Sequence, residues 1–203
     1  YSTEDTPGCA VGVMQDGAYI HKQGYGAANL EHQIPISGHS VFRIASVSKQ
    51  FTALAIAILA ERDELDLDAE IHTYIPELPD FDTPVTVRQM VHHISGMGDY
   101  DLDFEPAPGK GFRFGNQDYW THDEFLTEVL EKPLVQPPGK EFRYSNLAYF
   151  LLSQVVERVS GKSLRVFASE EIFGPLEMNQ TFFNDNVNEI VPHRADGDVP
   201  RSG

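Results

Sequence analysis

Cysteine is almost absent from the sequence. The single one, Cys9, excludes an intrachain disulfide and a metal cluster built on several cysteines, and it leaves the redox compartment open. Because Cys9 lies in an apolar run that ends at Val13, we expect it to be a buried, small hydrophobic residue. Long hydrophobic runs are also missing, since the longest, residues 53–60, is far shorter than the ~20 residues that cross a bilayer. We therefore expect no membrane span.

Basic residues are scarce. The chain has 15 Lys and Arg against 31 Asp and Glu, and its formal net charge of −16 argues against a nucleic acid or an anionic membrane as a partner. Hydrophobic residues make up 41% of the 203 positions, enough to bury a core, which predicts one large globular domain or two small ones. The chain opens on Tyr1 with no basic and apolar leader, so we expect any export signal to have been removed.

The clearest short-range signal is a β-hairpin near the N-terminus. Two β-like runs, residues 10–15 and 18–23, are joined by Asp16-Gly17, a pair that favours the tight turn of a hairpin. Residues 42–44 could form a further short strand. Because an isolated hairpin is marginally stable, we expect partner strands that the sequence does not reveal.

Apolar residues at helical spacing, with cap and stop signals around them, predict five helices. They run over about 46–62, 87–93 and 121–131, from near Leu147 to Gly161, and over about 163–173. Residues 99–119 have no period and are predicted to form a long loop, of the kind that binds ligands or is disordered.

Two serines and a lysine stand at the start of the first predicted helix. If the helix begins at Ser46, then Ser46 and Lys49 share a face, and the ammonium can reach the hydroxyl. A neighbouring base or cation is what turns a serine hydroxyl into a nucleophile. The amides and the dipole of a first helical turn also favour negative charge there. The alternative is a serine N-cap beside a solvated lysine, although lysine is unfavourable at a helix N-terminus.

A second candidate element, Tyr144 to Asn146, precedes the predicted helix at Leu147. In an extended segment residues i and i+2 point the same way, so Tyr144 and Asn146 could both face a cleft. A tyrosine beside a lysine ammonium can be held partly as phenolate and act as a base. Asparagine offers a donor and an acceptor to a substrate amide. The alternative is a helix N-cap at Asn146 with Tyr144 as a packing aromatic.

No metal site and no cofactor are expected. His92 and His93 are adjacent and point apart on a helix, unlike the i, i+4 pair of a zinc helix. Asp99, Asp101 and Asp103 imitate the start of a calcium loop, but a phenylalanine stands where that loop requires glycine. We therefore expect a solvated loop around these aspartates.

In their order and spacing these elements resemble the serine β-lactamase and penicillin-binding protein superfamily, within it the class C β-lactamase-like branch. Ser-x-x-Lys stands at residues 46–49, a His-x-Ser-Gly core at 93–96 and Tyr-x-Asn at 144–146. The resemblance covers nearly the whole chain. It implies an α/β (α+β) fold of the β-lactamase/transpeptidase type, with an antiparallel sheet flanked by helices and a mainly helical region.

The resemblance also implies a role for each candidate residue. Ser46 would be the acylated nucleophile, Lys49 its ammonium partner and Tyr144 the base. Asn146 would contact substrate and lysine, and residues 93–96 would support the site without reacting. The implied function is a serine hydrolase acting on an amide or ester, such as a β-lactam, a D-Ala-D-Ala peptide or a simple ester. The alternatives are an esterase of the same family and a non-catalytic binding or assembly fragment.

The family's third motif, Lys-Thr-Gly or His-x-Gly on a strand in the C-terminal part, has no match after Asn146. We therefore expect residues 1–45 to belong to the sheet region, 46–178 to form the mainly helical region, and 179–203 to be a loop leading toward an absent C-terminal part. The open hairpin would then self-associate or bind a complementary C-terminal chain. A periplasmic or extracellular location is what the resemblance implies.

Overall fold

The computed structural model describes residues 6–99, 121–129, 132–186 and 188–196. The described residues of 1–45 and of 188–203 form one compact unit, and those of 46–187 form a second. The division falls between Ala45 and Ser46, so all four candidate site residues lie in the second unit.

The predicted hairpin is present in the first unit. Strand β1, Cys9–Gln15, pairs antiparallel with β2, Ala18–Tyr25. Asp16 and Gly17 connect them with φ of 51° and 78°, and two central residues of positive φ are what a type I′ turn requires. The local turn signal therefore locates both strands.

A second pair of short strands follows, β3 at Ala27–Asn29 and β4 at Ile34–Pro35. The strand expected at residues 42–44 is wrong, because the only pairing there is an isolated bridge between Val41 and Arg194. The bridging partner comes from near the other end of the chain, so no local pattern could have indicated it.

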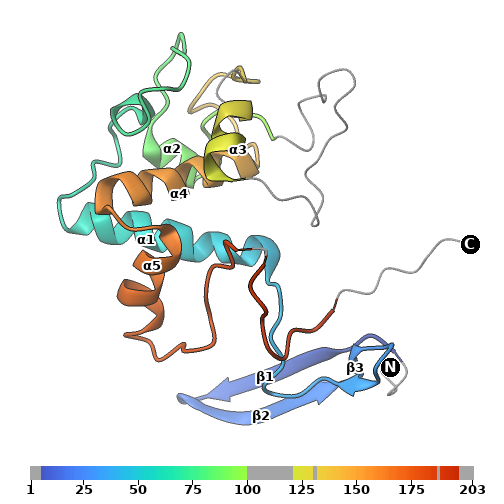
Figure 1. The fold of residues 1–203 in the computed structure, drawn as a ribbon. Helices are drawn as coiled ribbons and strands as arrows, with labels where there is room; N and C mark the ends of the chain where they lie inside the picture. Colours follow the sequence, from blue (N-terminus) through green and yellow to red (C-terminus); the bar gives the residue numbers. More distant parts are fainter. Residues whose placement is uncertain (1–5, 100–120, 130–131, 187, 197–203) are drawn as a thin grey trace, which may run out of the picture. The chain divides into compact units, whose positions relative to one another are not determined.

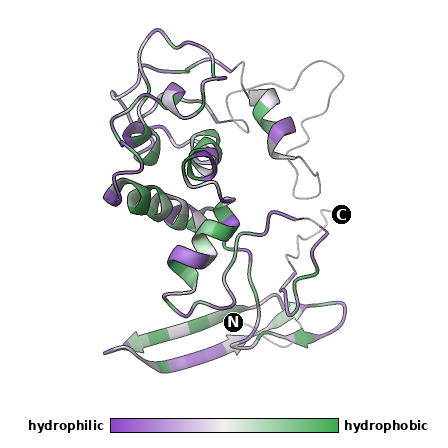
Figure 2. Ribbon diagram, turned by 60° about the vertical axis from the view of Figure 1, so that its left-hand side comes forward, coloured by the Kyte–Doolittle hydropathy of each residue, from purple (hydrophilic) through white to green (hydrophobic). Residues whose placement is uncertain are grey.

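The hairpin buries very little surface in the described structure. Every residue of β1 is exposed, and so is every residue of β2 except Gly24, which is half-buried. Strand β1 is largely apolar, whereas the middle of β2 is polar (Figure 2). Cys9 is exposed and not buried as expected, like every other residue of β1.

The second unit is built around two helices that pack against each other, α1 at Lys49–Glu61 and α4 at Asn146–Ser160 (Figure 1). Their facing stripes are fully buried, with Ile56 and Leu59 from α1 and Leu152 from α4 at 1% exposure or less. Each such side chain contributes about 1.5–3 kcal/mol to folding. The smaller helices are α2 (Val87–Val91), α3 (His122–Val129) and α5 (Leu164–Ala168), with a π-helical turn at Ser169–Phe173.

The helix ends refine the sequence-based bounds. A 3₁₀ turn, Ala45–Ser48, precedes α1. The cap of α4 is Ser145 and not Asn146, since the Ser145 hydroxyl accepts from Ala148 N. Gly161, with φ of 70°, ends α4 as predicted. The loop expected at 99–119 lies outside the described residues except for Asp99.

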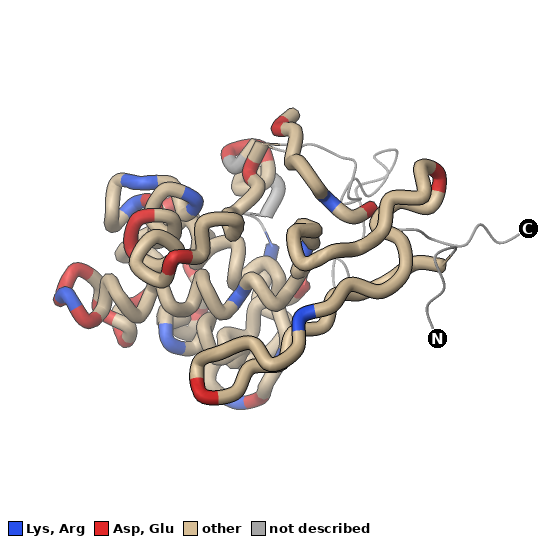
Figure 3. Tube along the Cα trace, turned by 90° about the horizontal axis from the view of Figure 1, so that it is seen from below, with Lys and Arg blue, Asp and Glu red and all other residues tan. Residues whose placement is uncertain are grey.

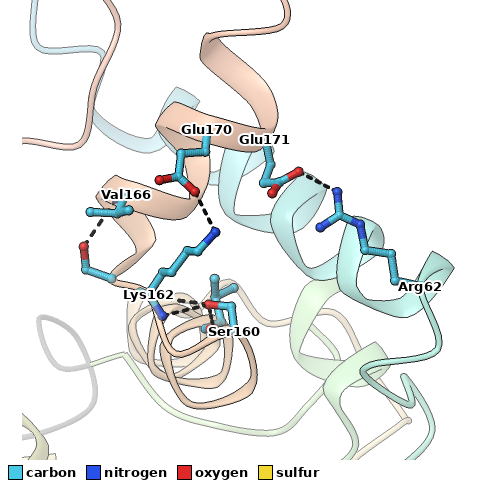
Figure 4. A network of polar contacts seen from close by, with 8 residues as sticks. Arg62, Ser160, Lys162, Val166, Glu170 and Glu171 are labelled. Carbon is cyan, nitrogen blue, oxygen red and sulfur yellow. Dashed lines mark hydrogen bonds and ion pairs between the residues drawn. The ribbon is translucent and has the colours of Figure 1, made fainter.

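Charged side chains join the helices at the surface. Arg62 at the end of α1 pairs with Glu171, and Lys162 after α4 pairs with Glu170, both acids lying in the π-helical turn (Figure 4). Because these side chains are exposed to solvent, each pair contributes little to stability. The acidic residues are spread over many separate positions of the described chain (Figure 3). None of the described helices has the length and hydropathy needed to cross a membrane.

Candidate active site

Ser46 is held on a tight turn immediately before α1. It belongs to the 3₁₀ turn Ala45–Ser48 and is exposed. The preceding residue, Ala45, has φ of 45°, a left-handed conformation that costs energy for a residue with a Cβ atom. Ser48 occupies the cap position of α1 but makes no side-chain cap bond. The Ser46 hydroxyl is instead directed toward Tyr144.

Lys49 is the first residue of α1 and is half-buried. Its Nζ donates to Ser46 Oγ at 3.3 Å and to Asn146 Oδ1 at 2.6 Å. The ammonium also lies 4.9 Å from the ring centroid of Tyr144 and 5.5 Å from that of Tyr149. Cation–π attraction therefore helps to hold the lysine beside the serine.

Tyr144 and Asn146 lie on the same side of the chain, as the i, i+2 spacing predicts, and Tyr144 contacts Ser46. The Tyr144 hydroxyl lies 2.6 Å from Ser46 Oγ, and it donates to Asn146 Oδ1 at 3.1 Å. With its own proton directed to Asn146, the phenol oxygen is left to accept from the Ser46 hydroxyl. The structure thus brings together Ser46, Lys49, Tyr144 and Asn146, the four residues singled out from the sequence.

Asp99 is a further member of the site that the sequence did not indicate. Its side chain is 1% exposed and not solvated as expected, and its Oδ2 accepts from Asn146 N at 3.0 Å and from Asn146 Nδ2 at 2.9 Å. These bonds orient the Asn146 amide so that Oδ1 faces Lys49. The interaction joins residues 47 positions apart, so no local pattern indicates it. Asp101 and Asp103 lie outside the described residues.

His93 supports the Tyr-x-Asn segment from behind. Its Nδ1 accepts from Ser145 N at 3.1 Å, and its ring stacks on the Tyr144 ring with 4.7 Å between centroids. Burial, followed by the charge of Lys49, lowers the pKa of His93, while Asp99 acts in the opposite sense. The neutral imidazole is therefore the favoured form.

Gly96 and Ser145 complete the support. A Cβ on Gly96 would lie 2.1 Å from the Gln136 carbonyl oxygen, and its φ of 75° also favours glycine. Ser145 is fully buried, and its hydroxyl donates to Gly98 O at 2.9 Å. The segment after α2 and the start of α4 are thus joined by backbone and side-chain bonds.

Within the described ranges, no cluster of three or more His, Cys, Asp or Glu side chains is arranged to hold a metal ion. What the site offers is a hydroxyl, an ammonium, a phenol and an amide within hydrogen-bonding distance of one another.

Comparison with known proteins places the chain in a family. The family model described as beta-lactamase matches residues 2–200. The chain belongs to the beta-lactamase family. It shares the superfamily of serine β-lactamases and penicillin-binding proteins, and with it the mixed α/β fold of β-lactamase/transpeptidase-type proteins.

Several curated relatives match most of the length of this chain. Penicillin-binding protein 4* of Bacillus subtilis is 30% identical over 196 residues, covering 92% of this chain and 41% of that protein. Esterase EstB of Burkholderia gladioli is 33% identical, covering 84% of this chain and 45% of its own length. The chain therefore spans less than half the length of these curated relatives.

Solved structures of proteins from this superfamily also match the fold of this chain. The octameric penicillin-binding protein homologue from Pyrococcus abyssi superposes with a TM-score of 0.77 at 28% identity, covering 95% of this chain and 44% of the other. The D-amino acid amidase from Ochrobactrum anthropi gives a TM-score of 0.77 at 25% identity, covering 94% and 50%.

Proposed function

We propose that this chain acts as a serine hydrolase that forms an acyl-enzyme on Ser46. The observation that carries the proposal is the placement of Ser46 Oγ 2.6 Å from the Tyr144 hydroxyl and 3.3 Å from Lys49 Nζ. A base and a cation beside one hydroxyl are the groups that nucleophilic catalysis by serine requires. The family match supports the same reaction class.

In this mechanism Tyr144 moves the proton. The base is the phenolate form of Tyr144, whose negative charge the Lys49 ammonium stabilises. Its oxygen takes the proton of Ser46 as Oγ attacks the carbonyl carbon, and Tyr144 becomes a neutral phenol. When the tetrahedral intermediate collapses, the bond to the leaving amine or alcohol breaks, and Tyr144 returns the proton to that group. Tyr144 as base is the feature that a class C-like assignment implies.

The second half of the cycle uses the same residues. Water loses a proton to Tyr144 as it attacks the acyl carbon, and the acid product leaves as the proton returns to Ser46 Oγ. Asn146, oriented by Asp99, holds Lys49 in place and offers its amide to the substrate. Each proton taken up is given back, so the cycle balances.

The substrate class is an amide or ester carbonyl. Relatives are named as a penicillin-binding protein, a D-aminopeptidase and an esterase, and each name describes the relative only. The test is turnover of a nitrophenyl ester, a D-amino acid amide, a D-Ala-D-Ala peptide and a chromogenic β-lactam, with Ser46→Ala as control. We expect hydrolysis of at least one that Ser46→Ala abolishes. A folded protein inactive on all four would favour a non-catalytic binding role.

A further inference from the structure

His93 contacts the chain on both sides of Tyr144. Its carbonyl oxygen accepts from Arg143 N at 2.7 Å, and its Nδ1 accepts from Ser145 N at 3.1 Å. Between these bonds the imidazole stacks on the Tyr144 ring, with 4.7 Å between centroids and 28° between planes. One residue therefore fixes the residue before Tyr144, the residue after it and the ring itself.

The bond from Ser145 defines the state of the imidazole. A backbone N–H can only donate, so Nδ1 must be unprotonated, and the ring is neutral with its proton on Nε2. Protonation would place a second donor at Nδ1, facing the Ser145 N–H. The bond would then be lost, and a cation would lie beneath the Tyr144 ring.

We propose that His93 is a pH-sensitive positioning residue for Tyr144: the neutral imidazole holds the phenol against Ser46, and protonation releases it. The proposal rests on the proposed hydrolase function and adds its regulation by pH. It explains how a residue that does not touch Ser46 controls the 2.6 Å contact between Tyr144 and Ser46.

Taken together, the groups around the His93 ring disfavour a positive charge on it. Lys49 from α1 repels the imidazolium, and Asp99, after α2, attracts it. Tyr149 of α4, tilted at 4.9 Å between centroids, and Phe142, edge-on at 5.7 Å, add burial. Burial and Lys49 outweigh Asp99, so the pKa of His93 lies below its ordinary value of 6.5.

Asparagine at position 93 separates the hydrogen bond to Ser145 N from the protonation of the side chain. His93 has φ of 56°, and asparagine tolerates this left-handed conformation well. In His93→Asn the amide Oδ1 takes the place of Nδ1 and accepts from Ser145 N, but it does not ionise. Both His93→Asn and His93→Ala remove the stacked ring, and His93→Ala removes the acceptor for Ser145 N as well. The exposed neighbour, in His92→Asn, is the matched control.

The first readout is the rate at which a fluorophosphonate labels Ser46 as a function of pH. We expect the wild-type rate to fall below pH 6.5, and His93→Asn to keep most of the neutral rate while losing that part of the fall. His93→Ala should be about 10- to 100-fold slower at neutral pH. His92→Asn should behave as wild type. An unchanged pH profile in His93→Asn, or a full rate in His93→Ala, would overturn the proposal.

The second readout needs no reaction. In Ser46→Ala protein, NMR should show the His93 ring and the Ser145 amide shifting together, with a midpoint below 6.5. In the Ser46→Ala, His93→Asn double variant the Ser145 amide should not titrate. If the chemical shift of the Ser145 amide did not change as His93 titrates, the positioning role would be contradicted, even if Ser46 reacts. If Ser46 were not labelled but His93 and the Ser145 amide still titrated together, the proposed function would be contradicted and the positioning role supported.

Stability should change in the same direction. Because the folded-state pKa of His93 is lowered, the unfolded chain takes up the proton first as the pH falls below 6.5. The contribution of His93 to the free energy of unfolding is therefore complete above pH 6.5 and declines as the pH falls toward the folded-state pKa. His93→Asn should show a smaller acid decline than wild type in denaturant unfolding, and an equal decline would count against the proposal.

Discussion

Asn146 Oδ1 is shared by two donors, Lys49 Nζ and the Tyr144 hydroxyl, and both of these also contact Ser46 Oγ. The amide therefore fixes the spacing of the cation and the phenol around the serine. Asp99 in turn fixes the amide through the Asn146 Nδ2 and backbone N–H groups. At this scale the site is a chain of oriented polar atoms.

Removal of the cation or of the phenol hydroxyl should slow acylation without unfolding the protein. We expect Lys49→Ala and Tyr144→Phe to reduce the rate of Ser46 labelling by about 10²–10⁴-fold, the usual loss when a general base or its partner is removed. Both residues are half-buried, so circular dichroism and Tm should stay near wild type.

The exposed Lys140 and Tyr19 supply matched controls, Lys140→Ala and Tyr19→Phe, which should label at the wild-type rate. If the two site variants lost labelling and folding to the same extent, the cluster would be a packing feature and not a site.

Ser46 and Lys49 could be predicted from the sequence because three-residue spacing alone places them together. Tyr144 and Asn146 could be paired with each other by the period of an extended segment, but their contact with Lys49 spans 97 residues for Asn146 and required the family resemblance. Asp99 was missed because its partner, Asn146, is distant in the sequence and a short aspartate repeat resembles a solvated loop.

At the scale of elements, the start of α4 is held by several hydrogen bonds of one residue, Ser145. Ser145 is fully buried, and it accepts from Ala148 N, donates to Gly98 O and offers its backbone N–H to His93. The start of α4 and the segment after α2 are therefore held together through this residue. Tyr144 and Asn146 flank it and take their positions from it.

Ser145→Ala should therefore destabilise the protein more than a surface change does. The loss of the cap and of the partner of the buried Gly98 carbonyl predicts about 1–3 kcal/mol less free energy of unfolding. Arg62→Ala, which breaks an exposed ion pair, should cost clearly less than Ser145→Ala. Denaturant unfolding measures both free energies of unfolding. An equal loss in the two variants would show that the hydrogen bonds of Ser145 do not stabilise the protein more than a surface ion pair does.

Helices could be predicted more reliably than strands. The apolar stripes of α1 and α4 are local patterns, and the hairpin turn at Asp16-Gly17 is a local signal. Strand pairing at Val41 depends on Arg194, and the left-handed His93 that follows α2 is set by bonds to residues 143 and 145. Such long-range partners explain why the strand at 42–44 was wrong.

On the scale of the whole molecule, the hairpin is an exposed two-stranded sheet. In the described chain β1 and β2 pair only with each other, and Val11 and Val13 are 40% and 42% exposed. Open strand edges with apolar side chains favour pairing with another chain. We propose that this hairpin pairs with a second copy of the chain.

The purified chain should therefore self-associate. Light scattering should give a mass above that of the 22.7 kDa monomer, and Val13→Lys should shift it toward the monomer, because charge on an exposed strand discourages pairing. Amide exchange on residues 10–23 provides the second measurement. A clean monomer with strongly protected hairpin amides would contradict the proposal.

The central claim is that Ser46 is the nucleophile, and intact-mass analysis after incubation with a fluorophosphonate, and separately with a labelled penicillin, tests it most directly. We expect one covalent adduct per chain with at least one of the two reagents, mapped by peptide analysis to Ser46 and absent from Ser46→Ala. A folded protein that forms no adduct with either reagent, or one whose adduct lies on another residue and persists in Ser46→Ala, would contradict it.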